Sequence, residues 1–273
     1  MKLTDTHCHL NLDQFDLDRE AVLDRAVQAG IEHILIPGLN LSSSQSALEL
    51  AEGHPGLVAA IGVHPTEVSK ADRSILDDFR KLAQHPKVKA IGEIGLDYYW
   101  DVTPHELQQR LLGNQLDLAT ELNLPVVIHF REKAGASAGN CASDLMRILK
   151  EWGAGLKREK SPLAERPGVL HSFSGTLEMA RSAMELGFYI GVAGPVTFEK
   201  SRRRQELVAA LPLDHILIET DAPFQTPHPN QGKRNEPAYI HLIADKIALV
   251  RSCTTEQVAT ATSENARRLF AWE

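Results

Sequence analysis

Eight short segments with the composition of buried β-strands alternate with helical patterns along this chain of 273 residues. Most of the segments are rich in valine and isoleucine, which is typical of parallel strands covered on both faces. They span residues 3–9, 33–37, 58–64, 90–96, 126–130, 169–173, 188–192 and 216–221. Eight strands alternating with helices over about 250 residues predict a single (β/α)8 barrel of the TIM type. A doubly wound open sheet is the alternative, but eight units without a glycine-rich fingerprint favour closure.

Two sequence patterns mark expected helix starts. The residues Thr-Pro-His-Glu at 103–106 form a capping box with proline at the first helical position. The residues Thr-Thr-Glu-Gln at 254–257 repeat the box ahead of the last helical segment. We therefore predict helices that begin at these two boxes.

The sequence contains no linker that would divide it, so we expect one domain over residues 1–273. One irregular stretch, 133–167, has a Gly/Ala/Ser-rich piece at 135–140, an expected helix at 141–152 and a charged tail at 157–166. We interpret it as an extended loop. Two interpretations of this loop stay open: a lid over the active site, or a mobile surface insertion.

Charge and cysteine content limit the classes of partner and compartment. The formal net charge of -7 gives no sign of a broad basic groove, so tight binding of nucleic acid through phosphate neutralisation alone is not expected. A nucleic-acid substrate held locally beside a metal stays compatible with this charge. Three scattered cysteines predict a reducing compartment. With no signal-peptide pattern and no apolar run of roughly 20 residues, we expect a cytoplasmic protein without a membrane span, its oligomeric state open.

The first strand segment ends in a pair of histidines. In a strand, alternate side chains share a face, so His7 and His9 point one way and Cys8 points the other. Two imidazoles two residues apart can chelate one cation. Asp5 has the same phase and is expected to orient a ligand from behind. Alone, this pair is a weak signal.

The ends of other strand segments carry further metal-ligand residue types. Active sites of such barrels are built at the C-terminal ends of the strands. These positions hold His7, His9, His64, Glu93, His129, His171 and Asp221. Imidazole and carboxylate are the ligand types of borderline and harder divalent metals. Since histidine is not a usual occupant of buried parallel strands, the set as a whole predicts a metal site.

At these same residues the sequence resembles the TatD-type metal-dependent hydrolases, often described as deoxyribonucleases, of the amidohydrolase superfamily. The resemblance covers nearly the whole chain. Its motifs are Asp-Thr-His-Cys-His-Leu at 5–10, Gly-Glu-Ile-Gly-Leu-Asp-Tyr-Tyr at 92–99, Pro-Val-Val-Ile-His at 125–129, His-Ser-Phe-Ser-Gly at 171–175, Glu-Thr-Asp-Ala-Pro at 219–223, Lys-Arg-Asn-Glu-Pro at 233–237 and Glu-Asn-Ala-Arg-Arg-Leu-Phe at 264–270.

The resemblance implies a centre with two divalent metal ions. One would be held by His7, His9, Glu93 and Asp221, and the other by Glu93, His129 and His171. Glu93 would bridge the two, which suits the roughly 3.5–4 Å separation of two-metal hydrolysis and offsets part of their charge. The identity of the metal stays open, since Zn²⁺, Mn²⁺ and Fe²⁺ suit histidine ligands and Mg²⁺ could serve a nuclease.

Catalytic roles are expected for the two carboxylates among these ligands, Asp221 and Glu93. We predict that Asp221 ligates a metal and manages the proton of the attacking water, a pure ligand role being the alternative. Glu219 is either a residue behind the ligands or the buried partner of a basic residue. His64 is the least certain of the set and is expected to contact substrate rather than metal.

Three polar or aromatic side chains near the barrel mouth suggest the substrate. Arg234 either binds a phosphate or is a solvated surface residue. Tyr98 and Tyr99 either stack on bases or plug their loop against the barrel.

With the resemblance, these residues favour hydrolysis of DNA phosphodiester bonds, in single strands or from a strand end, as an exonuclease. Alternatives are hydrolysis of a small ester, amide or phosphoester, deacylation of aminoacyl-tRNA, and a non-catalytic metal-stabilised binding protein.

Overall fold

The alternating segments fold into a barrel of eight parallel strands in sequence order. The computed structural model describes residues 1–70, 74–100, 102–133 and 140–272. The strands are β1 (Leu3–Asp5), β2 (Ile31–Pro37), β3 (Leu57–Ile61), β4 (Val88–Asp97), β5 (Val126–Arg131), β6 (Gly168–Leu170), β7 (Tyr189–Val192) and β8 (Ile216–Ile218). A doubly wound sheet would reverse its strand order at a switch point, so the prediction of a (β/α)8 barrel is confirmed.

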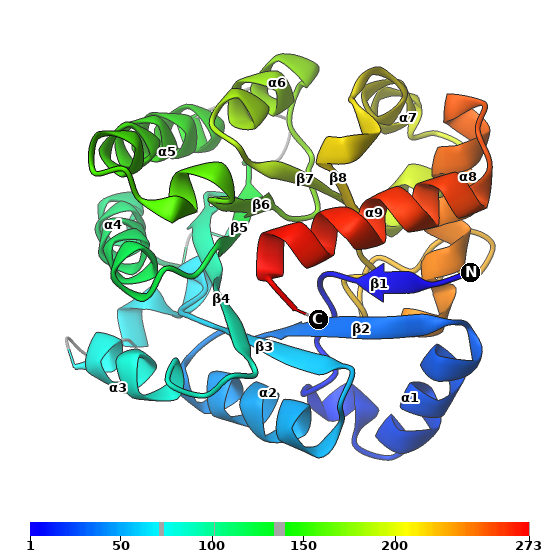
Figure 1. The fold of residues 1–273 in the computed structure, drawn as a ribbon, viewed down its shortest axis with the longest axis horizontal. Helices are drawn as coiled ribbons and strands as arrows, with labels where there is room; N and C mark the ends of the chain where they lie inside the picture. The colour runs from blue at the N-terminus through cyan, green and yellow to red at the C-terminus, as the bar shows by residue number, and fades with distance from the viewer. Residues whose placement is uncertain (71–73, 101, 134–139, 273) are drawn as a thin grey trace.

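Helices surround the strands on the outside of the barrel (Figure 1). They are α1 (Arg19–Gln28), α2 (Leu41–Gly53), α3 (Ile75–Leu82), α4 (His105–Leu122), α5 (Asn140–Arg158), α6 (Leu177–Glu185), α7 (Arg202–Ala210), α8 (Ile240–Arg251) and α9 (Thr255–Phe270). Within the described residues, no helix is long and apolar enough to cross a membrane.

The helix starts agree with one of the two predicted capping boxes. Before α9, the Thr254 hydroxyl accepts from the Gln257 backbone N–H, and the Gln257 side chain accepts from the Thr254 backbone N–H. Before α4 the prediction is wrong. Pro104 is the N-cap residue there and not the first helical residue, and no side chain makes a capping bond. The Gln108 amide donates to the Thr103 carbonyl in the same loop.

Helix α5 confirms the helix that was predicted at 141–152 within the irregular stretch 133–167, and less of that stretch is loop than expected. Helix α5 continues six residues past the predicted end at Trp152. Its buried stripe of Leu145, Leu149 and Leu156 explains the extension, since these residues recur at helical spacing. Lys157 and Arg158 in the last turn also suit the negative end of the helix dipole. The Gly/Ala/Ser-rich piece up to residue 139 lies outside the described residues.

The chain closes the barrel by joining β1 to β8 beyond the ends of both strands. The Thr6 backbone N–H donates to the Ile218 carbonyl, and the Asp221 N–H donates to the His7 carbonyl. An isolated parallel bridge pairs Cys8 with Ala222. These bonds bring the first and last strands together, so residues from distant parts of the sequence meet at one side of the mouth.

Helix α9 covers the opposite end of the barrel (Figure 1). Its Phe270 and the following Trp272 belong to the same buried cluster as the interior strand residues Val127 and Leu217. The Asn265 amide donates to the carbonyl of Ile216, the first residue of β8. Since this end is sealed by apolar packing, the C-terminal ends of the strands form the open face.

Candidate metal centre

His7, His9 and Asp221 converge where β1 and β8 are joined. Both histidines lie beyond the last residue of β1, where the chain bonds to residues 218–222 and, through the Cys8 N–H and the Leu35 carbonyl, also to β2. Their Nε2 atoms are 3.2 Å apart, which confirms that the two side chains share a face. The Asp221 Oδ1 atom lies 3.7 Å from His7 Nε2 and 3.5 Å from His9 Nε2. Three donor atoms therefore enclose one position.

Asp5 supports this group through the backbone and not through an imidazole. Its Oδ1 accepts from the backbone N–H groups of His7 and Thr220, at 3.3 and 2.9 Å, and its Oδ2 accepts from the Thr220 hydroxyl at 2.5 Å. Asp5 therefore lies behind a ligand as expected, but it contacts the His7 backbone and not its imidazole. Instead, Asp5 fixes the backbone of both ligand-bearing segments. Burial raises its pKa to about 7, against the opposing effect of the Thr220 hydrogen bonds.

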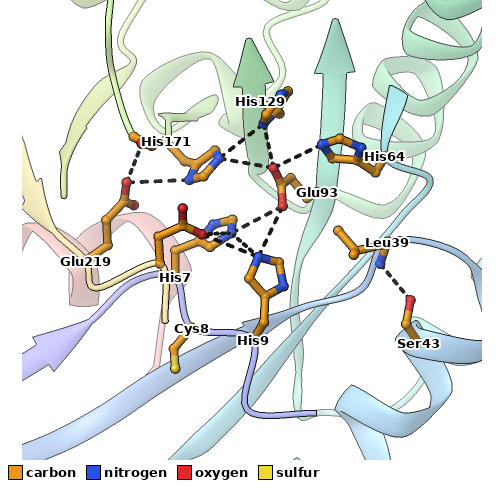
Figure 2. Close-up of polar contacts among 12 residues, drawn as sticks. His7, Cys8, His9, Leu39, Ser43, His64, Glu93, His129, His171 and Glu219 are labelled. Atoms are coloured by element: carbon orange, nitrogen blue, oxygen red, sulfur yellow. Dashed lines mark hydrogen bonds and ion pairs between the residues drawn. The ribbon is translucent and has the colours of Figure 1, made fainter. Parts of the chain in front are cut away.

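Glu93 lies at the centre of the cluster, with its two carboxylate oxygens facing different histidines (Figure 2). Its Oε2 is 3.2 Å from His7 Nε2 and 3.7 Å from His9 Nε2. Its Oε1 is 2.8 Å from His129 Nδ1 and 3.0 Å from His171 Nε2. This carboxylate therefore joins the β1–β8 group to a second group from β5 and the loop after β6.

His64 belongs to the second group. Its Nε2 lies 3.5 Å from Glu93 Oε1, and its Nδ1 is 2.7 Å from the Thr66 hydroxyl. Burial, together with the neighbouring His129, lowers the pKa of His64 to about 3. Its imidazole is therefore neutral at physiological pH and can act as a donor to a cation. Because His64 lies beside Glu93, it is placed where it could ligate a metal, whereas a substrate contact was expected.

The charge state of the cluster suits positively charged ligands. Burial alone would raise the pKa of Glu93, but His171 and His7 outweigh it and hold that pKa well below its usual range. Burial likewise opposes ionisation of Asp221, yet the hydrogen bond from His9 and the charges of His7 and His171 lower its pKa. In the chain alone, Glu93 raises the pKa of His171 well above its usual value despite burial. Bound cations would replace such protons.

The donor atoms form three sets that fit metal coordination. Each set places one ligand atom per residue within 4.8 Å of the others. The sets are His7–His9–Asp221, His7–Glu93–His171 and His64–Glu93–His129. Imidazole nitrogens with carboxylate oxygens match the preferences of Zn²⁺, Mn²⁺ and Fe²⁺. The residues present therefore fit divalent cations on both sides of Glu93.

A second carboxylate lies behind each histidine of the β5–β6 group. Asp97 Oδ2 is 3.1 Å from His129 Nε2, and Glu219 Oε1 is 3.5 Å from His171 Nδ1. Carboxylates in this position fix the orientation of ligand histidines. Glu219 also accepts from the Ser172 backbone N–H, so it is a positioning residue. The sequence analysis missed Asp97, although its phase four residues after Glu93 places it on the same face of β4.

The Arg234 side chain is held by other residues and is not free to reach a ligand at the open face of the barrel. Its guanidinium forms a bidentate ion pair with Asp18, at 2.7 Å for both oxygens, and lies over the Phe15 ring at 4.7 Å. Arg234 is therefore an exposed surface residue, as one of its two interpretations held, but its guanidinium is engaged in an ion pair. Arg234 holds the loop after β8 against the start of α1.

We expect Arg234→Gln to lower the thermal midpoint by about 1–3 °C and to leave hydrolysis unchanged. The hydrogen bond from Arg234 lowers the pKa of Asp18 below 3.8. Its stabilisation should therefore be present above that value and disappear as the pH falls through the lowered folded pKa. In a thermal-melt cycle, Asp18→Asn should add to Arg234→Gln only the smaller effect of its contact with Arg25, at 3.6 Å. A fall in kcat/KM for nucleic acid in the Gln variant would instead restore the phosphate role.

Tyr98 plugs its loop against the barrel, as one of its two interpretations held. The side chain is buried, its hydroxyl is 2.9 Å from Asp144 Oδ2, and its ring stacks on His105 at a centroid distance of 3.4 Å. It is therefore not free to stack on a base. The next two residues are exposed instead: Tyr99 by 39% and Trp100 by 50%. The Arg131 guanidinium lies 4.0 Å from the Tyr99 ring centroid.

A parallel eight-stranded barrel with histidine and carboxylate groups at its open face places this chain among the metal-dependent hydrolases. The profile of the family described as "TatD related DNase" matches residues 4–271. The chain belongs to this family.

Similar proteins agree with that membership over their full lengths. An uncharacterized metal-dependent hydrolase of Bacillus subtilis, YabD, is 41% identical over 268 residues, which cover 98% of each chain. The 3'-5' ssDNA/RNA exonuclease TatD of Pantoea vagans is 36% identical, over 97% of this chain and 98% of that protein. The crystal structure of YjjV, a TatD homologue from Escherichia coli, superposes with a TM-score of 0.88 at 33% identity, over 99% and 98% of the two chains.

Proposed function

We propose that this protein is a nuclease that uses two divalent cations to hydrolyse phosphodiester bonds of single-stranded nucleic acid, working from a strand end. One observation carries the proposal: the two oxygens of Glu93 face two separate groups of histidines. A bridging carboxylate of this kind is what a two-metal hydrolytic site requires. The TatD relative of Pantoea vagans, named as a 3'-5' ssDNA/RNA exonuclease, supports the substrate class and the direction.

The chain would hold the first cation with His7, His9, Asp221 and Glu93, and the second with Glu93, His129, His171 and His64. Bound cations would polarise the phosphoryl group and lower the pKa of a water to about 7. Glu93 contributes the negative charge between the two positions, since it is buried and anionic.

Asp221 is suited to accept a proton at the reacting centre. Its Oδ1 faces His7 and His9, while its Oδ2 accepts from the Gln225 amide. The Gln225 amide donates as well to the Ser172 hydroxyl at 2.7 Å. These bonds fix the carboxylate plane, so one oxygen stays directed at the site while its pKa stays low. Gln225 was not predicted, because its contact with Ser172 in the loop after β6 depends on the fold.

The decisive test is a panel of substrates offered to the metal-reconstituted protein. Zn²⁺, Mn²⁺, Mg²⁺ or Fe²⁺ is added after chelation, with His7→Ala as the inactive control. We expect cleavage of single-stranded DNA, with a ladder of products that shortens from the 3′ end of a 5′-labelled strand. Turnover of only a small ester, a small phosphoester or aminoacyl-tRNA would overturn the nuclease proposal and keep the hydrolase class.

Exposed aromatic rings beside the site favour a single-stranded substrate. Phe224 is 48% exposed with its ring 6.0 Å from that of His9, and Trp100 and Tyr99 follow β4 on the same open face. Unpaired bases stack on such rings irrespective of sequence.

We expect Trp100→Ala to raise the KM for single-stranded DNA about tenfold, since stacking contributes about 1–3 kcal/mol per base. The kcat should not change, because the bond from Trp100 to Asp97 is made by the backbone N–H, which the variant keeps. Steady-state kinetics on a labelled strand measure both constants. Trp100→Phe, which keeps a ring, should recover most of the affinity, and hydrolysis of bis(p-nitrophenyl) phosphate should be unaffected. An equal loss on that small substrate would argue for a disturbed fold instead.

A further inference from the structure

A cavity of about 610 Å³ opens beside the metal centre but outside it. It is bounded by the loops after β6 and β7 and by α6 and α7, the two helices at the top of Figure 1. None of the histidine, glutamate and aspartate residues assigned to the metals lines it. Ser172 and Gln225 do line it, and the Gln225 amide also donates to Asp221. Gln225 would therefore contact both a ligand in this cavity and the Asp221 carboxylate.

A cluster of cationic side chains flanks this cavity. The start of α7 carries Lys200, Arg202, Arg203 and Arg204 within five residues, in a chain with a net charge of -7. Arg203 and Arg204 line the cavity, together with a single carboxylate, Glu206. Within the described residues, neither arginine has a hydrogen-bond or ion-pair partner.

The placement of these arginines is unfavourable for the isolated fold. The N-terminus of a helix carries partial positive charge, so cations in the first turn destabilise it. The first turn of α7 contains no acidic residue, and Ser201 makes no side-chain capping bond. The guanidinium of Arg204 is moreover partly removed from water, which lowers its pKa. Among the residues that the structure describes, Arg202, Arg203 and Arg204 have no hydrogen-bond or ion-pair partner, so their charges are available to an anion from outside the chain.

We propose that this cavity binds phosphate groups of the nucleic-acid strand beyond the bond that is cleaved, with Arg203 and Arg204 as the phosphate ligands. The ligand is a phosphodiester anion, which guanidinium groups bind through paired N–H donors. This inference rests on the proposed function for the kind of strand that enters the site. It adds a second point of attachment, which holds the strand while its end lies at the metals.

The test measures binding separately from cleavage. The protein is Arg203→Gln/Arg204→Gln, loaded with metal, and the probe is a short fluorescein-labelled phosphorothioate strand, which resists hydrolysis. The matched control is Arg267→Gln/Arg268→Gln in α9, where two adjacent arginines lie at the sealed end of the barrel. Fluorescence anisotropy gives the affinity as a function of salt concentration.

We expect the slope of log K against log salt to become shallower by about 1.4, since each phosphate contact on a single strand contributes about 0.7. The control pair should keep the wild-type slope. Both variants should hydrolyse bis(p-nitrophenyl) phosphate at the wild-type rate, because one phosphodiester group occupies only the metal site. The thermal midpoint of the Arg203/Arg204 variant should not fall, because these side chains lack partners.

Each other outcome overturns a different claim. An unchanged slope in the Arg203/Arg204 variant, beside normal strand cleavage, overturns the cavity inference alone. Loss of inorganic phosphate or mononucleotide binding, with an unchanged slope for the strand, overturns the strand as ligand and assigns the cavity to a free phosphate compound. Arginine-dependent binding of the strand without any cleavage supports the cavity and overturns the proposed nuclease function instead.

Discussion

Asp221→Asn should lower kcat/KM for single-stranded DNA by about 10³-fold, the size of effect expected when a proton acceptor is removed. Asparagine has the same shape but cannot take up the proton. The backbone of Asp221 has a φ of +56°, and asparagine is one of the few side chains that tolerates this left-handed conformation. The variant should therefore fold normally. Initial rates on a labelled strand and a thermal melt measure the two properties.

Metal content separates the two roles considered for Asp221. If the Asn variant keeps the wild-type metal stoichiometry and loses activity, the carboxylate handles the proton. If it loses one metal with the activity, Asp221 is needed as a ligand, and the lost activity no longer requires a proton role. Asp214→Asn makes the same change at an exposed pair with His215 and should be silent. Equal activity in Asp221→Asn and the wild type would point to a contaminating nuclease and contradict the proposal.

Glu93→Gln should reduce activity further, because it removes the charge that both cation positions share. Cations supply several kcal/mol of transition-state stabilisation, so their loss corresponds to about 10³–10⁴-fold in rate. Glutamine keeps one oxygen, but its amide NH₂ would face one of the two histidine groups and cannot ligate a metal. We therefore expect at most one metal per chain by elemental analysis, against two in the wild type.

A second measurement of Glu93→Gln does not depend on activity. Added Zn²⁺ or Mn²⁺ should raise the thermal midpoint of the wild type, since a ligand that binds only the folded state stabilises it. In the variant, this rise should shrink or vanish. Glu121→Gln, which changes an exposed glutamate paired with Arg80, should respond as the wild type does. A full metal-dependent rise in Glu93→Gln would contradict the bridging role.

The sequence predicted the barrel and the metal-ligand cluster because both depend on short-range patterns. The period-two alternation placed His7 and His9 on one face, and the position of Glu93 late in a strand placed it at the open end. Strand ends were less accurate. β1 ends at Asp5, because the backbone near His7 and His9 bonds to the loop after β8, and no local pattern reveals that pairing.

What could not be predicted depends on contacts between distant segments. Arg234 pairs with Asp18, 216 residues away, so its sequence neighbours suggested a free guanidinium. The role of Tyr98 could not be predicted for the same reason, because its hydroxyl donates to Asp144 on α5. The basic residues at 200–204 are visible in the sequence, but no local pattern indicates which part of the barrel they lie beside. Their position beside the site is set by the fold of the barrel.

The junction of β1 with β8 also has a consequence for the order of events during synthesis. Asp5 and Thr220, which hold the two segments together, are 215 residues apart, or roughly 10–40 s of translation. His7, His9 and Glu93 are therefore synthesised well before Asp221. The first cation position becomes complete only when nearly the whole barrel has been made. If this position binds a cation as proposed, tight binding there requires a nearly complete polypeptide.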